Sequence, residues 1–155
     1  MRVLPAIMAL IVPGALWAQI EVALPLPSEK YGLKGEVPTV EMPPLDTAAV
    51  HQKKPAPGAK PYEFAKVFEV DLTPENSGQW TDIPGRGKLW TLGVLSEGAY
   101  SLNLTFGRYK LPDGARLFVY DQARTDIAGA FTSMNNKASG KLAIRPVPGD
   151  ALVVE

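Results

Sequence analysis

The stretch Tyr100-Ser101-Leu102-Asn103-Leu104-Thr105-Phe106 carries the clearest structural pattern in the chain. Apolar side chains occupy every second position, and the positions between them are polar. Successive side chains of a β-strand point to opposite faces, so this alternation predicts a strand with one buried and one solvated face. The residues expected in the core are Tyr100, Leu102, Leu104 and Phe106.

Similar patterns surround this stretch on both sides. Period-two alternation begins at residue 64, and turn sequences rich in Gly, Pro, Asn and Asp separate the apolar runs. No window after residue 62 shows the apolar stripe of an amphipathic helix. Short strands separated by turns predict an all-β domain over residues 63–155, a small β-sandwich of the jelly-roll-like kind. The expected strands are 64–70, 89–95, 100–106, 116–121, 127–132, 141–145 and 151–155.

The N-terminus has the layout of a secretory signal peptide. Arg2 provides a positive start, residues 3–17 carry no charge, and Ala18 is a small residue before polar sequence. A membrane-spanning helix needs about 20 apolar residues, which is longer than this run. We therefore expect residues 1–18 to be removed between Ala18 and Gln19, and the chain to be secreted or held in the cell envelope. Because Leu16 is large for its position, the exact bond stays open.

Residues 19–62 are predicted to form a proline-rich spacer. Eight prolines fall between residues 21 and 62. Each proline fixes φ and removes an N–H donor, which disfavours a helix or sheet of useful length. Disordered or polyproline-like chain is the main expectation, with residues 47–52 the only candidate for a local element. The alternative is that part of the spacer lies against the domain as a strand.

Composition excludes several classes of function. Sixteen basic residues balance sixteen acidic ones, so no net field attracts nucleic acid or an anionic membrane. Cysteine is absent, and His51 is the one histidine in the sequence. The cysteine and histidine ligands of a usual zinc site are therefore lacking. A Ser–His–Asp triad would have to use His51, which lies in the proline-rich spacer and is not expected to be held within reach of a partner. No catalytic residue, cofactor or metal site is therefore predicted, and the chain itself is expected to lack enzymatic activity.

Carboxylates in turns are the remaining candidates for chemistry. Asp121 and Asp126 bracket one turn, and Asp113 lies in another. Such oxygens can bind calcium. Aspartate also stabilises turns by accepting hydrogen bonds from its own backbone, and this is the preferred interpretation.

Aromatic residues near strand ends are candidates for surface contacts. Trp80 and Tyr109 are predicted to be exposed, whereas Trp90 and Tyr100 are expected in the core. A sugar-binding surface would use exposed rings of this kind, so carbohydrate stays open as a ligand. Asn103-Leu104-Thr105 also matches the N-glycosylation sequence.

An ordered series of segments resembles a known family. The segments are Lys88–Val94, Gly98–Phe106, Leu111–Tyr120, Gly129–Ser133, Asn135–Lys137 and Pro146–Asp150. Together, over about residues 66–155, they resemble the N-terminal region of secreted bacterial trypsin-like serine endopeptidases of the lysyl-endopeptidase type. In that family this region is non-catalytic, and the catalytic residues lie downstream. The resemblance implies that this domain continues past Glu155 in a longer precursor.

The resemblance implies an accessory role for this chain. A β-domain in that position would assist the folding, latency or positioning of a downstream protease domain, which is the expected partner. A free-standing extracellular module that binds carbohydrate or protein is the competing class. Neither expectation involves nucleic acid, or a membrane once the signal peptide has been removed.

Overall fold

The structure of the chain is a computed structural model that describes residues 21, 23–44 and 65–155. The signal peptide with its Ala18–Gln19 bond, residues 47–52 and His51 lie outside the described residues. Strands dominate the rest, and the fold is all-β, as the sequence predicts. Helical structure is confined to a single turn, α1 (Pro27–Lys30), and a short 3₁₀ segment, η1 (Ser133–Asn135), within the described residues.

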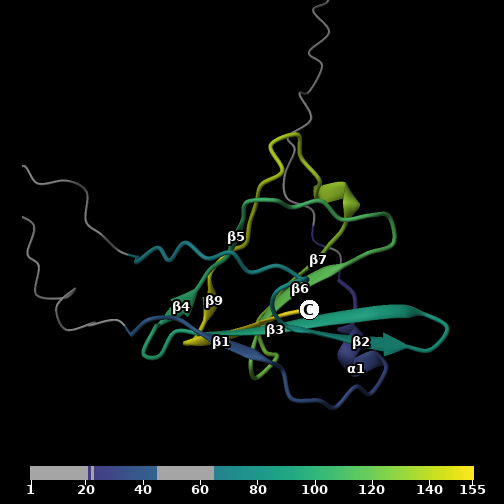
Figure 1. Ribbon diagram of the computed structural model, residues 1–155, viewed down its shortest axis with the longest axis horizontal. Helices are drawn as coiled ribbons and strands as arrows, with labels where there is room; N and C mark the ends of the chain where they lie inside the picture. Colours follow the sequence, from purple (N-terminus) through teal and green to yellow (C-terminus); the bar gives the residue numbers. More distant parts are fainter. Residues whose placement is uncertain (1–20, 22, 45–64) are drawn as a thin grey trace, which may run out of the picture.

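The main sheet has the strand order β1-β3-β10-β6-β7 (Figure 1). Two further strand pairs, β4–β9 and β5–β8, lie beside it, and β2 pairs with the first half of β3. The strands are β1 (Thr39–Glu41), β2 (Gln79–Ile83), β3 (Gly87–Leu95), β4 (Ser101–Leu102), β5 (Thr105–Phe106), β6 (Leu117–Asp121), β7 (Ile127–Phe131), β8 (Leu142–Ala143), β9 (Val147–Pro148) and β10 (Ala151–Val154).

Strand β3 organises the sheet because it pairs with three other strands. Its first half forms an antiparallel hairpin with β2, closed by a turn in which Arg86 N donates to Ile83 O at 2.9 Å. Its second half pairs antiparallel with β10 and parallel with β1. Strand β1 therefore comes from far upstream in the sequence to form one edge of the sheet.

Alternate residues of the central strands enter two different cores. In β6, Val119 belongs to one cluster, while its neighbours Phe118 and Tyr120 belong to the other. In β10, Leu152 belongs to the same cluster as Val119, and Val153 belongs to the cluster of Phe118 and Tyr120. Both faces of the main sheet are thus covered by other parts of the chain.

The larger core lies between the main sheet and the two strand pairs. Buried residues of β3, β6, β7 and β10 meet Leu142 of β8 and Val147 of β9 there. Leu102, Leu104 and Phe106 pack against this core as half-buried side chains, and the polar residues between them are exposed. The alternating burial of residues 101–106 is therefore confirmed. The prediction of one continuous strand over residues 100–106 is wrong, because β4 and β5 are separate and pair with different strands.

Tyr100 does not follow that pattern. Its side chain is 81% exposed, so the prediction that it is buried is wrong. Strand β4 begins one residue later, directly after a turn in which Ala99 N donates to Ser96 O. The backbone carbonyl of Tyr100 still accepts from Gly149 N at 2.9 Å, so Tyr100 is held by its backbone rather than by burial of its ring.

The smaller core is covered by residues 23–44, which we call the N-terminal strap. Leu26 is 1% exposed and packs with Phe118, Tyr120, Ala130 and Val153. The strap ends in β1, which completes the edge of the sheet. The prediction that residues 19–62 form a spacer outside a domain of residues 63–155 is therefore wrong for residues 23–44. Prolines fix φ but still permit a single helical turn and a three-residue edge strand.

Two other differences concern the next part of the chain. Residues 65–73 form no strand although their pattern alternates, and Val67 is 77% exposed. The strand of this region is β2, in a stretch that the sequence analysis left between two expected strands. Pairing with the long strand β3 outweighed the local pattern there, because β propensity depends on the available partner.

Candidate functional site

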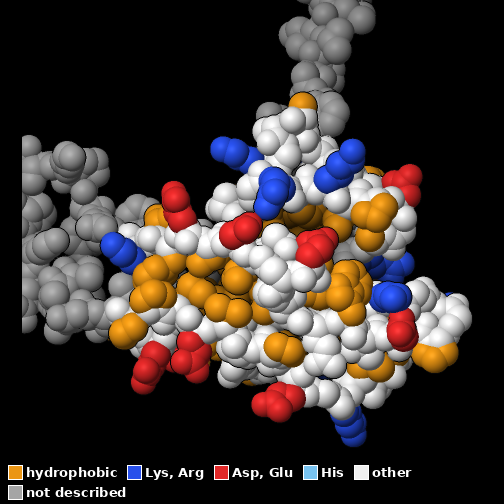
Figure 2. Space-filling view, viewed as in Figure 1, with side chains coloured by type: hydrophobic (Ala, Val, Ile, Leu, Met, Phe, Trp, Pro, Cys, Tyr) orange, Lys and Arg blue, Asp and Glu red, His pale blue; other side chains and the backbone are white. Residues whose placement is uncertain are grey.

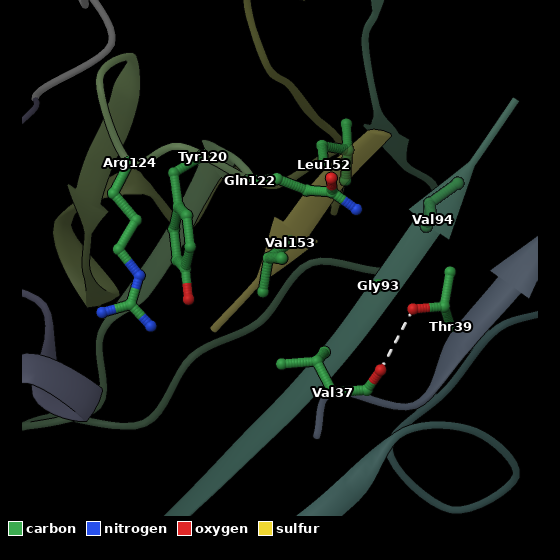
Figure 3. A pocket seen from close by; sticks show the side chains of 9 residues that line it. All are labelled: Val37, Thr39, Gly93, Val94, Tyr120, Gln122, Arg124, Leu152 and Val153. Carbon is green, nitrogen blue, oxygen red and sulfur yellow. Dashed lines mark hydrogen bonds between the residues drawn. The ribbon is translucent and has the colours of Figure 1, made fainter. Parts of the chain in front are cut away.

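A pocket of about 260 Å³ opens on the face of the main sheet that carries the strap (Figure 3). Strands β1, β3, β10 and β6 all contribute to it, together with Val37 of the strap and Gln122 and Arg124 of the turn after β6. Its lining combines apolar side chains, such as Val153, with polar ones, such as Gln122 and Arg124.

Gly93 determines how closely β1 approaches β3. A Cβ atom at this position would overlap Thr39 Oγ1. Gly93 is also one of the residues that line the pocket. Thr39 Oγ1 donates to Val37 O at 3.0 Å, which holds the start of β1 beside β3 (Figure 3).

Arg124 forms the charged part of the lining. Its guanidinium lies over the ring of Tyr120, 5.7 Å from the centroid, and its Nη1 is 3.2 Å from Glu29 Oε1 in the strap. Arg124 has a φ of 58°, a left-handed conformation in which the turn aims its side chain back over the sheet. The arginine therefore links the turn after β6 to the strap.

Glu155 forms the most distinctive polar cluster of the described residues. Its side chain is buried, and its carboxylate accepts three hydrogen bonds. Ser28 N donates to Oε1 at 2.7 Å, and both Ser28 Oγ and Tyr120 Oη donate to Oε2 at 2.7 Å. Burial of an ionised carboxylate is costly unless such donors satisfy it. We call these three residues the Glu155 latch, since they fasten the strap to β6 and to the end of β10.

The latch changes the acidity of Tyr120. Burial raises the pKa of its hydroxyl above the ordinary value of 10.0, and the hydrogen bond and negative charge of Glu155 raise it further. The hydroxyl therefore stays protonated and keeps donating throughout the neutral range.

Tyr109, which the sequence analysis predicted to be on the surface, is 5% exposed and belongs to the larger core. That prediction is wrong. The ring lies 6.3 Å from that of Phe106, and the hydroxyl donates to Thr132 O at 3.0 Å. A residue close to a strand end can still be buried when the two strand pairs fold over it.

Alkaline pH is expected to destabilise the protein through Tyr109. Burial raises the pKa of Tyr109 to about 12, whereas the unfolded chain ionises at the ordinary value of 10.0. The unfolded state thus loses its proton first, so this contribution is complete below pH 10 and is lost as the pH rises toward 12. Urea unfolding across this range should give a steeper loss of stability for the natural chain than for Tyr109→Phe. Equal slopes would contradict the assigned burial.

Of the turn carboxylates, Asp121 stabilises the backbone of its own turn. Asp121 accepts from Thr125 N, Thr125 Oγ1 and Asp126 N, each at 2.7 Å. Burial acts to raise the pKa of Asp121, but these hydrogen bonds together outweigh it and lower the pKa below its ordinary value. Asp126 forms an ion pair with Arg145, and Asp113 lies exposed in its own turn. No group of three potential metal ligands occurs among the described residues.

Trp80 is 52% exposed, in agreement with its predicted place on the surface. It lies opposite Trp90 in the β2–β3 hairpin, and its Nε1 donates to Pro74 O at 3.0 Å. Trp90 is half-buried, packs against the larger core and donates from Nε1 to Ser77 O at 2.8 Å. The two predicted surface residues are not brought together, since only Trp80 faces solvent.

Charged side chains of both signs are interspersed on the face seen in Figure 2, with apolar side chains between them. This distribution agrees with the balanced composition of the chain. It offers no continuous basic surface in this view for a polyanion.

No family model matches the sequence, and no solved structure matches the chain. Within residues 21, 23–44 and 65–155, no helix has the length and apolar character needed to cross a bilayer.

The residues that build this region were not among those predicted from the sequence: Ser28, Gly93, Tyr120, Arg124 and Glu155. Two stretches carried a usable signal, because residues 117–120 and 151–154 are continuously apolar rather than alternating. Strands of that kind are buried on both faces. They indicate that a further segment of the chain must cover the second face of the sheet.

Proposed function

We propose that this chain is the non-catalytic N-terminal region of a secreted serine endopeptidase precursor, exported by the signal peptide expected at residues 1–18. Its role is to assist folding, to maintain latency or to position a downstream protease domain. The ordered resemblance of residues 66–155 to such regions supports this assignment. The all-β fold agrees with a scaffold of this kind.

The observation that carries the proposal is the Glu155 latch. A buried carboxylate in an enzyme is often directed toward a substrate. Here both oxygens are occupied by donors from the strap and β6. The buried carboxylate of Glu155 thus holds the strap against the sheet. This supports a structural role for the chain.

A free-standing binding module is the second candidate. The exposed ring of Trp80 and the pocket between Arg124 and Val153 favour it, because ligand sites combine an apolar lining with a few polar groups. This alternative predicts that a soluble carbohydrate or peptide shifts the NMR signals of residues around Trp80 or the pocket.

The proposed function predicts that residues 19–155 alone will not hydrolyse lysyl or arginyl esters. Serine-protease chemistry needs a nucleophile, a base and an oriented acid together with oxyanion donors. A longer protein that includes the downstream sequence is expected to be active in the same assay. Turnover by residues 19–155 that survives repurification would contradict the proposal, and abolition of that turnover by His51→Ala would identify a catalytic residue instead.

A further inference from the structure

We infer that the N-terminal strap can dock on a second copy of this chain, so that two copies exchange straps and form a closed dimer. The inference is independent of the proposed function. It rests on where the contacts of the strap lie and on the length of chain that joins the strap to residues 65–155, which we call the body.

The contacts that hold the strap in place cross to the body. The backbone contributes the parallel pairing of β1 with β3, extended by hydrogen bonds from Gly93 N to Pro38 O at 2.8 Å and from Met42 N to Leu95 O at 2.7 Å. The side chains contribute the Glu155 latch and the ion pair of Glu29 with Arg124. Leu26 adds an apolar anchor that fills the smaller core.

The receiving surface is complete within the body. Residues 93–95 of β3, the apolar face of β6 and β10, Arg124 and Glu155 all lie between positions 93 and 155. A strap from another copy would meet the same partners in the same register. Exchange would therefore alter which chain supplies the strap without changing the contacts that it makes.

The connection is long enough to permit either arrangement. Residues 45–64 separate the strap from the body, a stretch of 20 residues. At about 3.3–3.6 Å per residue, its maximum span is roughly 66–72 Å. A domain of about 100 residues has a radius of gyration of about 13 Å, so this span exceeds the distance to an adjoining copy.

Concentration decides between the two arrangements. A strap tethered to its own body experiences an effective concentration on the order of millimolar. The closed monomer should therefore dominate in dilute solution, and exchanged dimers should form when the chain refolds at high protein concentration. Once formed, such dimers should persist on dilution, because release requires the strap to detach from the sheet and from the Glu155 latch.

The inference is tested by refolding residues 19–155 from urea at micromolar and at millimolar protein concentration. Light scattering then measures the molar mass and so separates monomer from dimer. The expected result is monomer in the first case and a fraction of dimer in the second. Leu26→Ala removes the apolar anchor from the closed monomer and from the exchanged dimer alike, so it should leave the ratio of dimer to monomer unchanged. A chain that is monomeric at every concentration would overturn the inference.

Cysteine pairing identifies the exchanged segment, since the sequence has no cysteine of its own. Glu41 lies opposite Leu95 in the β1–β3 pair. Refolding a mixture of Glu41→Cys and Leu95→Cys chains should give a mixed disulfide several-fold more often than a mixture of Glu41→Cys and Thr105→Cys chains, in which Thr105 is exposed on β5. The double variant Glu41→Cys/Leu95→Cys should close the same bond within the monomer. Equal yields from the two mixtures, with the double variant closed, would overturn the exchange of straps.

Discussion

Replacing Glu155 with alanine is expected to lower the free energy of unfolding by about 2–4 kcal/mol. The carboxylate accepts from Ser28 N, Ser28 Oγ and Tyr120 Oη in a buried setting. A buried donor left without a partner costs about 1–3 kcal/mol, and water entering the vacated space would satisfy part of the group. Urea unfolding of the natural chain and of Glu155→Ala measures the difference.

Matched variants distinguish the contribution of the carboxylate's hydrogen bonds to stability from the contribution of the space that the side chain fills. Glu155→Gln keeps the size of the side chain and one acceptor oxygen. Its free energy of unfolding should therefore lie between that of the natural chain and that of Glu155→Ala. Tyr120→Phe removes a single donor and should cost about 1–2 kcal/mol. A loss for Glu155→Ala within experimental error of zero would mean that the latch does not hold the strap.

Removal of the strap is expected to have the larger structural effect. A chain that begins at Ala65 lacks β1 and Leu26, and it exposes the apolar face formed by Phe118, Tyr120 and Val153. Natural domains are stable by about 5–15 kcal/mol, and the contacts of a whole segment account for a large part of that margin. We expect residues 65–155 to show no cooperative urea transition, whereas residues 21–155 should unfold cooperatively.

A single substitution in the strap tests the same contribution to stability with a smaller expected effect. Leu26→Ala in the longer chain should cost about 2–5 kcal/mol, as for other fully buried leucines, while leaving the transition cooperative. Exposed Val67 provides the control, and Val67→Ala should change stability by less than about 0.5 kcal/mol. A sharp transition from residues 65–155 would show that the larger core is sufficient on its own.

The sequence was informative where the pattern of one strand reports directly on its surroundings. Residues 101–106 alternate because one face meets the larger core and the other meets water. Strands β3, β6, β7 and β10 were likewise predicted from apolar runs bounded by turns. Their existence depends on local pattern, which a single sequence contains.

The features that were missed depend on pairing between distant segments. Nothing local in residues 39–41 indicates a strand, because β1 exists only through its parallel contact with β3. The role of Glu155 likewise depends on Ser28, which is 127 positions away in the sequence. The pocket has the same origin, since Gly93 is one of several similar glycines until β1 lies against it.

The position of β1 also bears on the solubility of the protein. A strand at the rim of a sheet leaves backbone donors and acceptors open to another molecule, which makes such rims sites of uncontrolled aggregation. Strand β1 is three residues long and is bracketed by Pro38 on one side and by Pro43 and Pro44 on the other. Proline lacks the N–H that a growing ladder requires. The prolines that suggested an unstructured spacer thus protect the exposed rim of the sheet against indefinite stacking of copies into fibres.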